Sequence, residues 1–133
     1  GIALLPGRLR WAGGVASNGD AVPPVSLAVV SRPGKDAAIV DAGSKALAAD
    51  VWPEAVGLRG YAEVAGGGGY VAWLNEEHGA VRLLDGYQPR VGDTMRLIPN
   101  HVCTVVNLSE ELVVIEGTQV VDRWLVAAGR CRT

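Results

Sequence analysis

A histidine and a cysteine stand two residues apart in the stretch IPNHVCTVVN, residues 98–107. On an extended segment the side chains at positions i and i+2 project to the same side, so the imidazole of His101 and the thiol of Cys103 can reach one small volume. Both groups are good zinc ligands. Two ligands do not complete a tetrahedral site, however, and a packed cysteine beside a histidine is the more common outcome in a valine-rich segment. The spacing by itself therefore does not establish a metal site.

A second polar cluster is NEEHG, residues 75–79, where one apolar run ends and another begins. Two carboxylates and an imidazole at such a place are typical of a solvated turn. Alternatively, Glu77 and His78 form a polar rim that contains an acid or a base, since histidine is suited to proton transfer. The chain has two histidines, one in each cluster. If the strands that bear the clusters pair, both clusters can face one cavity.

The segment DAGSKALAAD, residues 41–50, contains Lys45, one of two lysines in the chain. A Schiff-base lysine needs a pKa lowered by burial or by cationic neighbours. Asp41 and Asp50 flank Lys45 in the sequence, which favours a structural ion pair or a helix surface instead. Lys35, in RPGKDA, lies in an evident turn. Neither lysine therefore has the surroundings expected of a Schiff-base lysine.

Short runs rich in valine, leucine and isoleucine alternate with glycine and proline, which is the pattern of many short strands. The only persuasive helix is residues 44–50, which Ser44 could cap. The predicted fold is therefore mainly β, an antiparallel β-barrel or sandwich with one short helix. The predicted strands, mostly antiparallel, are residues 25–32, 37–43, 61–65, 70–74, 79–84, 93–98, 111–116 and 119–127.

Two glycine-rich stretches interrupt this pattern. Residues 1–24 contain Asn-Gly and Pro-Pro pairs, so we expect an irregular N-terminal segment followed by one β domain over residues 25–133. AGGGGY, residues 65–70, raises the question of a phosphate loop. Such a loop precedes a helix, whereas strand-like residues follow here, so we predict a hairpin loop.

Composition narrows the classes of function. A chain of 133 residues fits one domain with a real core. Its formal net charge of −2 gives no basic surface for nucleic acid or for an anionic membrane. We expect no membrane span, because no apolar run is long enough, and no signal peptide, because GIALLPGRLRW lacks a preceding basic flank and a cleavage pattern. The two cysteines, Cys103 and Cys131, allow at most one disulfide and favour a cytoplasmic protein.

Several segments together resemble one family. VVSRPGKDAAIVDAGSKALAAD, NEEHG, VGDTMRLIPNHVCTVVNLSEELVV and VVDRWLVAAGR are similar, in this order, to successive pieces of the C-terminal β domain of the D-serine dehydratase and D-threonine aldolase family. These are pyridoxal-phosphate enzymes of fold type III, and the resemblance spans about residues 25 to 130. It implies that His101 and Cys103 hold a divalent cation, zinc or another, that engages the β-hydroxyl of the substrate. It also places Glu77 and His78 near this site as candidate catalytic residues.

The enzymes of this family begin with an α/β barrel that bears the cofactor lysine, and this chain has neither the length nor the strand–helix alternation for one. Pyridoxal phosphate is therefore not expected on this chain alone. Three functions remain open. The chain is a metal-site domain that is not catalytic by itself and works against a barrel domain in trans; or a free-standing module that binds a small amino acid or hydroxy acid; or a β domain for association. A homodimer is also expected. The face that packs against the barrel in this family is expected to be apolar, and a second copy of the chain can cover it.

Overall fold

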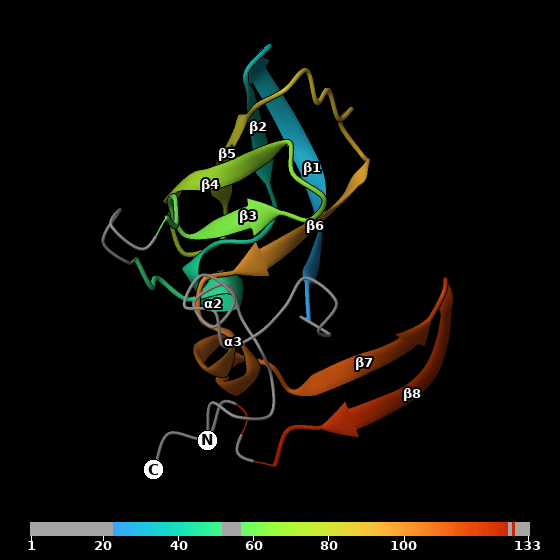
Figure 1. Cartoon of the computed structure of the whole chain (residues 1–133). Coiled ribbons are helices and arrows are strands. Elements are labelled where there is room, and N and C mark those ends of the chain that lie inside the picture. The colour runs from blue at the N-terminus through green and yellow to red at the C-terminus, as the bar shows by residue number, and fades with distance from the viewer. Residues whose placement is uncertain (1–22, 52–56, 128, 130–133) are drawn as a thin grey trace.

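The computed structural model of the chain describes residues 23–51, 57–127 and 129. Six strands close into an antiparallel barrel in the order β1-β2-β5-β4-β3-β6, while β7 and β8 form a separate two-stranded sheet (Figure 1). The predicted β fold is confirmed, and it is a closed barrel rather than a sandwich. The described elements are β1 Val25–Gly34, β2 Ala37–Val40, α2 Ser44–Leu47, β3 Ala62–Val64, β4 Gly69–Leu74, β5 Gly79–Leu83, β6 Thr94–Pro99, α3 Val102–Leu108, β7 Glu111–Glu116 and β8 Gln119–Leu125.

Every second residue of the barrel strands faces the interior. In β6, for example, Met95 and Leu97 are buried while Thr94 and Arg96 are exposed. This alternation follows from the pleat of a β-strand, which turns successive side chains to opposite faces. The interior is filled by apolar side chains, among them Leu27, Val29, Ala38, Val40, Ala62, Val64, Val71, Val81 and Leu83. Polar groups that could do chemistry are therefore left at the ends and on the outer wall of the barrel.

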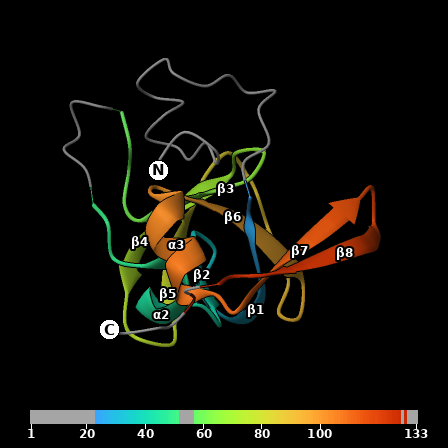
Figure 2. The ribbon, with the colours of Figure 1, turned by 90° about the horizontal axis from the view of Figure 1, so that it is seen from below.

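Neighbouring strands of the barrel run in opposite directions, so β2, β4 and β6 all end at the same end of it. The segments that follow them are α2, the turn at residues 75–78, and α3. Both helices lie at this end of the barrel, which we call the helical end (Figures 1 and 2). The three polar segments selected in the sequence therefore meet at the helical end.

Helix α3 is an element that the sequence analysis missed. Residues 98–107 were expected to be extended apart from a turn, and the structure places Val102–Leu108 in a helix with His101 as its N-cap. Val102 and Val105 are three positions apart, so they share one helix face, and both are buried. The helix packs against α2. Burial of this face decides the conformation, because tertiary packing overrides the weak preference of valine for strands.

The glycine-rich stretches behave as predicted where they are described. Residues 65–68 form the turn between β3 and β4, with positive φ angles at Gly66, Gly67 and Gly68, and β4 rather than a helix follows. The hairpin loop is confirmed. The predicted irregular segment at residues 1–24 stays a prediction, because residues 1–22 lie outside the described part of the chain.

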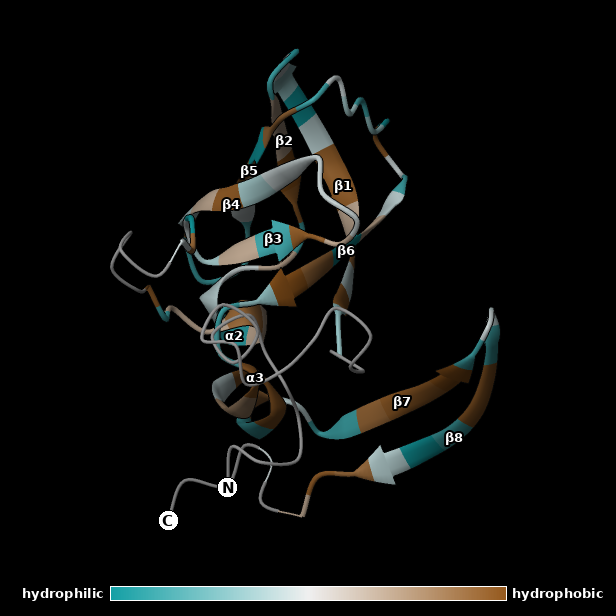
Figure 3. Cartoon of the chain, viewed as in Figure 1, coloured by the Kyte–Doolittle hydropathy of each residue, from teal (hydrophilic) through white to brown (hydrophobic). Residues whose placement is uncertain are grey.

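The hairpin of β7 and β8 projects away from the barrel (Figures 1 and 2). Its two strands turn at Gly117, which has a φ of +61°, so the predicted strands at residues 111–116 and 119–127 pair with each other. All seven residues of β8 are exposed. Hydrophobic residues line much of both strands (Figure 3), and the exposed large ones are Val113, Ile115, Val120, Val121, Trp124 and Leu125. The barrel leaves this apolar surface uncovered.

In the described part of the chain, no helix has the length and apolar character needed to cross a membrane.

Candidate functional site

His101 lies at the helical end, directly after β6. Its backbone is extended, with φ −134° and ψ 106°, and its side chain is 25% exposed. The preceding residue, Asn100, is only 1% exposed. Its Nδ2 atom donates hydrogen bonds to the carbonyl oxygens of Asp50, at 3.0 Å, and Gly60, at 2.7 Å. A buried amide with two such bonds anchors the backbone that bears His101, because breaking them would leave buried polar groups unpaired.

Cys103 lies in the first turn of α3 and is a half-buried free thiol. The expectation that an extended segment brings it to the same side as His101 is wrong, since Cys103 is helical. The pair nevertheless stays close, because two residues of chain span at most about 7 Å. Cys131, the other member of the disulfide considered above, lies outside the described residues.

His101 and Cys103 do not belong to a closed metal site in the described part of the chain. Within residues 23–51, 57–127 and 129, no three side chains of histidine, cysteine, aspartate or glutamate are grouped to hold a metal ion. A structural zinc site has four protein ligands, whereas sites that act on a substrate leave positions for water or substrate. At the start of α3 the structure places one imidazole and one thiol, which do not form a complete ligand set with other described residues.

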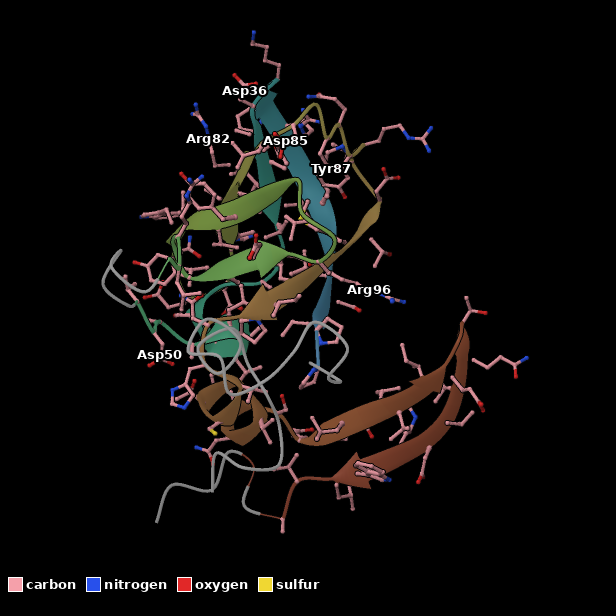
Figure 4. The ribbon with its side chains drawn as sticks, in the orientation of Figure 1. Asp36, Asp50, Arg82, Asp85, Tyr87 and Arg96 are labelled. Carbon is pink, nitrogen blue, oxygen red and sulfur yellow. The ribbon has the colours of Figure 1, made fainter. Side chains whose placement is uncertain are left out.

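Asp50 is a polar residue of this site that the sequence analysis did not assign to it. Its Oδ2 atom lies 3.8 Å from Nδ1 of His101 and accepts a 2.6 Å hydrogen bond from Oγ1 of Thr104. Figure 4 shows Asp50 at the helical end, whereas Asp36 and Asp85 lie at the opposite end of the barrel. No local sequence signal reveals the contact, because some fifty residues separate Asp50 from α3.

Glu77 and His78 lie in the turn between β4 and β5. The Oδ1 atom of Asn75 accepts hydrogen bonds from the backbone N–H groups of Glu77, at 2.9 Å, and His78, at 2.6 Å. The backbone N–H of Asn75 donates to the carbonyl oxygen of His78 at 2.9 Å. This is the geometry of an asparagine-stabilised turn. The exposed turn that was one of the two interpretations is therefore present, and it does not exclude a role for the side chains.

Lys45 forms an ion pair with Glu77. The hydrogen bond and charge of Glu77 raise the pKa of Lys45, and those of Lys45 lower the pKa of Glu77. The predicted structural ion pair is confirmed, but its acceptor differs from the flanking aspartates. Asp50 contacts α3, and Asp41 accepts a hydrogen bond from the backbone N–H of Ala28 at 2.7 Å.

Helix α2 connects the two polar clusters. Its N-cap is Gly43 rather than Ser44, and the cap uses no side chain. The backbone N–H groups of Ser44 and Lys45, which have no acceptor within the helix, donate to the carbonyl oxygens of Asn75, at 2.8 Å, and Glu76, at 3.2 Å. The strands that bear the clusters do not pair, since β3 lies between β4 and β6. The clusters are brought to one end by strand direction and are joined through α2, which packs on α3.

Residues 24–115 match the model of a family of serine dehydratase domains. The chain belongs to this family. The D-threonine aldolase of an Arthrobacter species is 38% identical over 106 residues, which are 78% of this chain and 26% of the aldolase. This serine dehydratase-like domain thus spans about a quarter of that enzyme. An uncharacterized protein of Mycobacterium tuberculosis is 37% identical over 112 residues, with 78% of this chain and 80% of that protein covered.

Solved structures share the fold of the serine dehydratase-like domain. An alanine racemase-like protein of Idiomarina loihiensis is 25% identical with a TM-score of 0.79, covering 94% of this chain and 36% of that one. A cysteine-to-alanine mutant of D-threo-3-hydroxyaspartate dehydratase in a metal-free form is 23% identical with a TM-score of 0.76, covering 94% and 37%. The domain corresponds to roughly a third of each of these chains.

The helical end of the serine dehydratase-like domain combines three kinds of group. His101 and Cys103 contribute an imidazole and a thiol, groups of borderline and soft character. Asp50 is a carboxylate beside the imidazole. The turn that contains Glu77 and His78 adds an ion pair and a second imidazole. The helical end therefore gathers two imidazoles, a thiol and two carboxylates.

Proposed function

We propose that this domain is the metal-site domain of a pyridoxal-phosphate-dependent D-amino-acid lyase or aldolase, with His101 and Cys103 as the ligands of a divalent cation. The observation that supports it is the placement of both donors at the start of α3, on a backbone that the buried Asn100 anchors. Zinc is the proposed cation, because an imidazole and a thiolate suit it.

A bound cation would act as a Lewis acid on the hydroxyl group of a substrate. The residues of the domain itself have simpler tasks. Asn100 fixes the backbone of His101, and Lys45 keeps Glu77 ionised, since their ion pair lowers the pKa of Glu77. Glu77 and His78 are the proposed catalytic residues at the rim, and the imidazole of His78 is the group suited to take and release a proton.

We assign pyridoxal phosphate to a barrel domain that works with this one, and not to the residues of this domain. A Schiff-base lysine needs a lowered pKa. Lys45 has the opposite shift, because Glu77 raises its pKa. The proposed substrate is a small hydroxy-bearing amino acid, and the domain is proposed to be inactive without its barrel partner.

Titration of the purified chain with Co²⁺ tests the metal site. Cobalt bound to a thiolate gives a ligand-to-metal charge-transfer band, so the band reports Cys103 as a ligand, and competition with Zn²⁺ gives the zinc affinity. We expect one ion per chain and loss of binding in His101→Ala and in Cys103→Ala. The matched control is His78→Ala, which removes the other imidazole and should keep the metal. Equal binding by wild type and His101→Ala would reject this function.

A second candidate function, association, is favoured by the hairpin of β7 and β8. Six large apolar side chains are exposed on these two strands. An isolated two-stranded sheet is marginally stable in water, so such a hairpin is expected to have a cover. We propose that two copies of the chain cover this surface for each other and form a homodimer.

A further inference from the structure

The side chains of Asp50 and His101 are partly buried at the helical end. Their side chains are 33% and 25% exposed, and Oδ2 of Asp50 is 3.8 Å from Nδ1 of His101. Solvent and salt therefore screen this pair less than a fully exposed one. Among the two ring nitrogens of His101, Nδ1 is the one that the carboxylate faces.

Two contacts hold Asp50 in this position. Asn100 donates to its carbonyl oxygen at 3.0 Å, and Thr104 donates to its Oδ2 atom at 2.6 Å. Asn100 directly precedes His101, and Thr104 follows it by three residues in the first turn of α3. Asp50 is therefore fixed to the same short segment that bears the imidazole.

A neutral imidazole has its proton on either Nδ1 or Nε2, and an ionised carboxylate can only accept hydrogen bonds. A carboxylate beside Nδ1 therefore favours the tautomer with the proton on Nδ1, which leaves the lone pair on Nε2. The separation of 3.8 Å is longer than a direct hydrogen bond, so the carboxylate acts on the imidazole as a nearby charge, and a water between the two atoms would carry the hydrogen bond. Histidines that bind metals commonly donate their other ring N–H to a carboxylate.

We propose that Asp50 is the positioning residue of His101 and holds the imidazole in its Nδ1–H tautomer, with the lone pair on Nε2. The use of this lone pair for a cation rests on the proposed function, whereas the tautomer itself does not require a metal.

The tautomer can be measured on the full chain without added metal. Two-bond ¹H–¹⁵N correlation spectra of histidine-labelled protein, recorded about two pH units above the ordinary histidine pKa of about 6.5, show which ring nitrogen bears the proton. We expect Nδ1–H for His101 in wild type. In Asp50→Asn, which keeps the size and an acceptor for Thr104, we expect a shift toward Nε2–H. His78 is the internal control, and its pattern should stay the same in both proteins.

Zinc affinity gives the second readout. Asp50→Asn should weaken binding by about 10- to 100-fold, as outer carboxylates of metal-binding histidines do. Thr104→Val keeps the carboxylate but removes the hydrogen bond that Thr104 donates to it. A smaller loss of zinc affinity is therefore expected.

The outcomes separate the two proposals. A wild-type His101 protonated on Nε2 overturns the positioning role, and this result needs no variant to fold. An unchanged tautomer in Asp50→Asn also overturns it, even if zinc binds. If the tautomer changes as expected but neither protein binds zinc, the positioning role stands and the metal site fails.

Discussion

Lys45 and Glu77 form an ion pair that ties α2 to the turn between β4 and β5. Nζ of Lys45 donates to Oε1 of Glu77, although 32 positions separate them in the sequence. The contact joins two of the three polar segments at the helical end of the barrel. It also raises the pKa of Lys45 and lowers the pKa of Glu77.

The pKa of Glu77 should rise when Lys45 is replaced. The hydrogen bond from Lys45 holds this pKa below its ordinary value, so the NMR titration midpoint of the Glu77 carboxyl should be lower in wild type than in Lys45→Met. Lys35→Met, which removes the other lysine, is the control and should leave the midpoint unchanged. Identical midpoints in wild type and Lys45→Met would contradict the ion pair.

The stability that this ion pair contributes should have a defined pH window. The folded-state pKa of Glu77 is lowered, so its contribution is present above the unfolded-state value of about 4.3 and is lost as pH falls through the folded-state pKa. The pKa of Lys45 is raised, so its contribution is present below about 10.4 and is lost as pH rises through the folded-state pKa. The difference in melting temperature between wild type and Glu77→Gln should therefore be largest between these limits, and a constant difference would refute the linkage.

Gly43→Ala should destabilise the fold by about 1–3 kcal/mol, because an added methyl group here overpacks a closed contact. A Cβ atom at Gly43 would overlap the carbonyl groups of Asn75 and Glu76, which accept hydrogen bonds from the start of α2. Gly34→Ala is the matched control, since a Cβ there meets nothing within 4 Å. Chemical denaturation of both variants measures the effect, and equal stabilities would show that α2 does not dock as described.

Asn100→Ala should lower the free energy of unfolding by about 1–3 kcal/mol, because it leaves two partly buried carbonyl groups without their donor. The lost bonds are those to Asp50 and Gly60. Asn107→Ala replaces an exposed asparagine of α3 and should change stability little. Thermal unfolding compares the two, and a wild-type melting temperature for Asn100→Ala would rule out the anchoring role.

The proposed homodimer should dissociate when the hairpin surface becomes polar. Light scattering should show two copies of wild type and a single copy of the double variant Trp124→Ser, Leu125→Ser, whose side chains are 57% and 85% exposed. Trp73→Ser changes an equally exposed tryptophan, 52%, on the barrel and should stay dimeric. A wild type that is monomeric at high concentration would end this proposal.

Local patterns in the sequence were sufficient to predict the strands and to indicate the family. Alternation along segments such as β2 and β6 follows from the pleat, and glycine at a turn such as Gly117 follows from its positive φ, so both are encoded within a few residues. The residue types at His101, Cys103, Glu77 and His78 likewise indicated which chemistry to look for.

Only the tertiary structure decided where those residues lie. Valine-rich residues 102–106 become helical because Val102 and Val105 are buried together, and this burial depends on α2 and not on neighbours in the sequence. The partners of Lys45 and Asp50 are also distant in the chain, Glu77 for one and Thr104 for the other. Such contacts form between segments that barrel closure brings together. A pattern of residue types along one strand therefore cannot predict them.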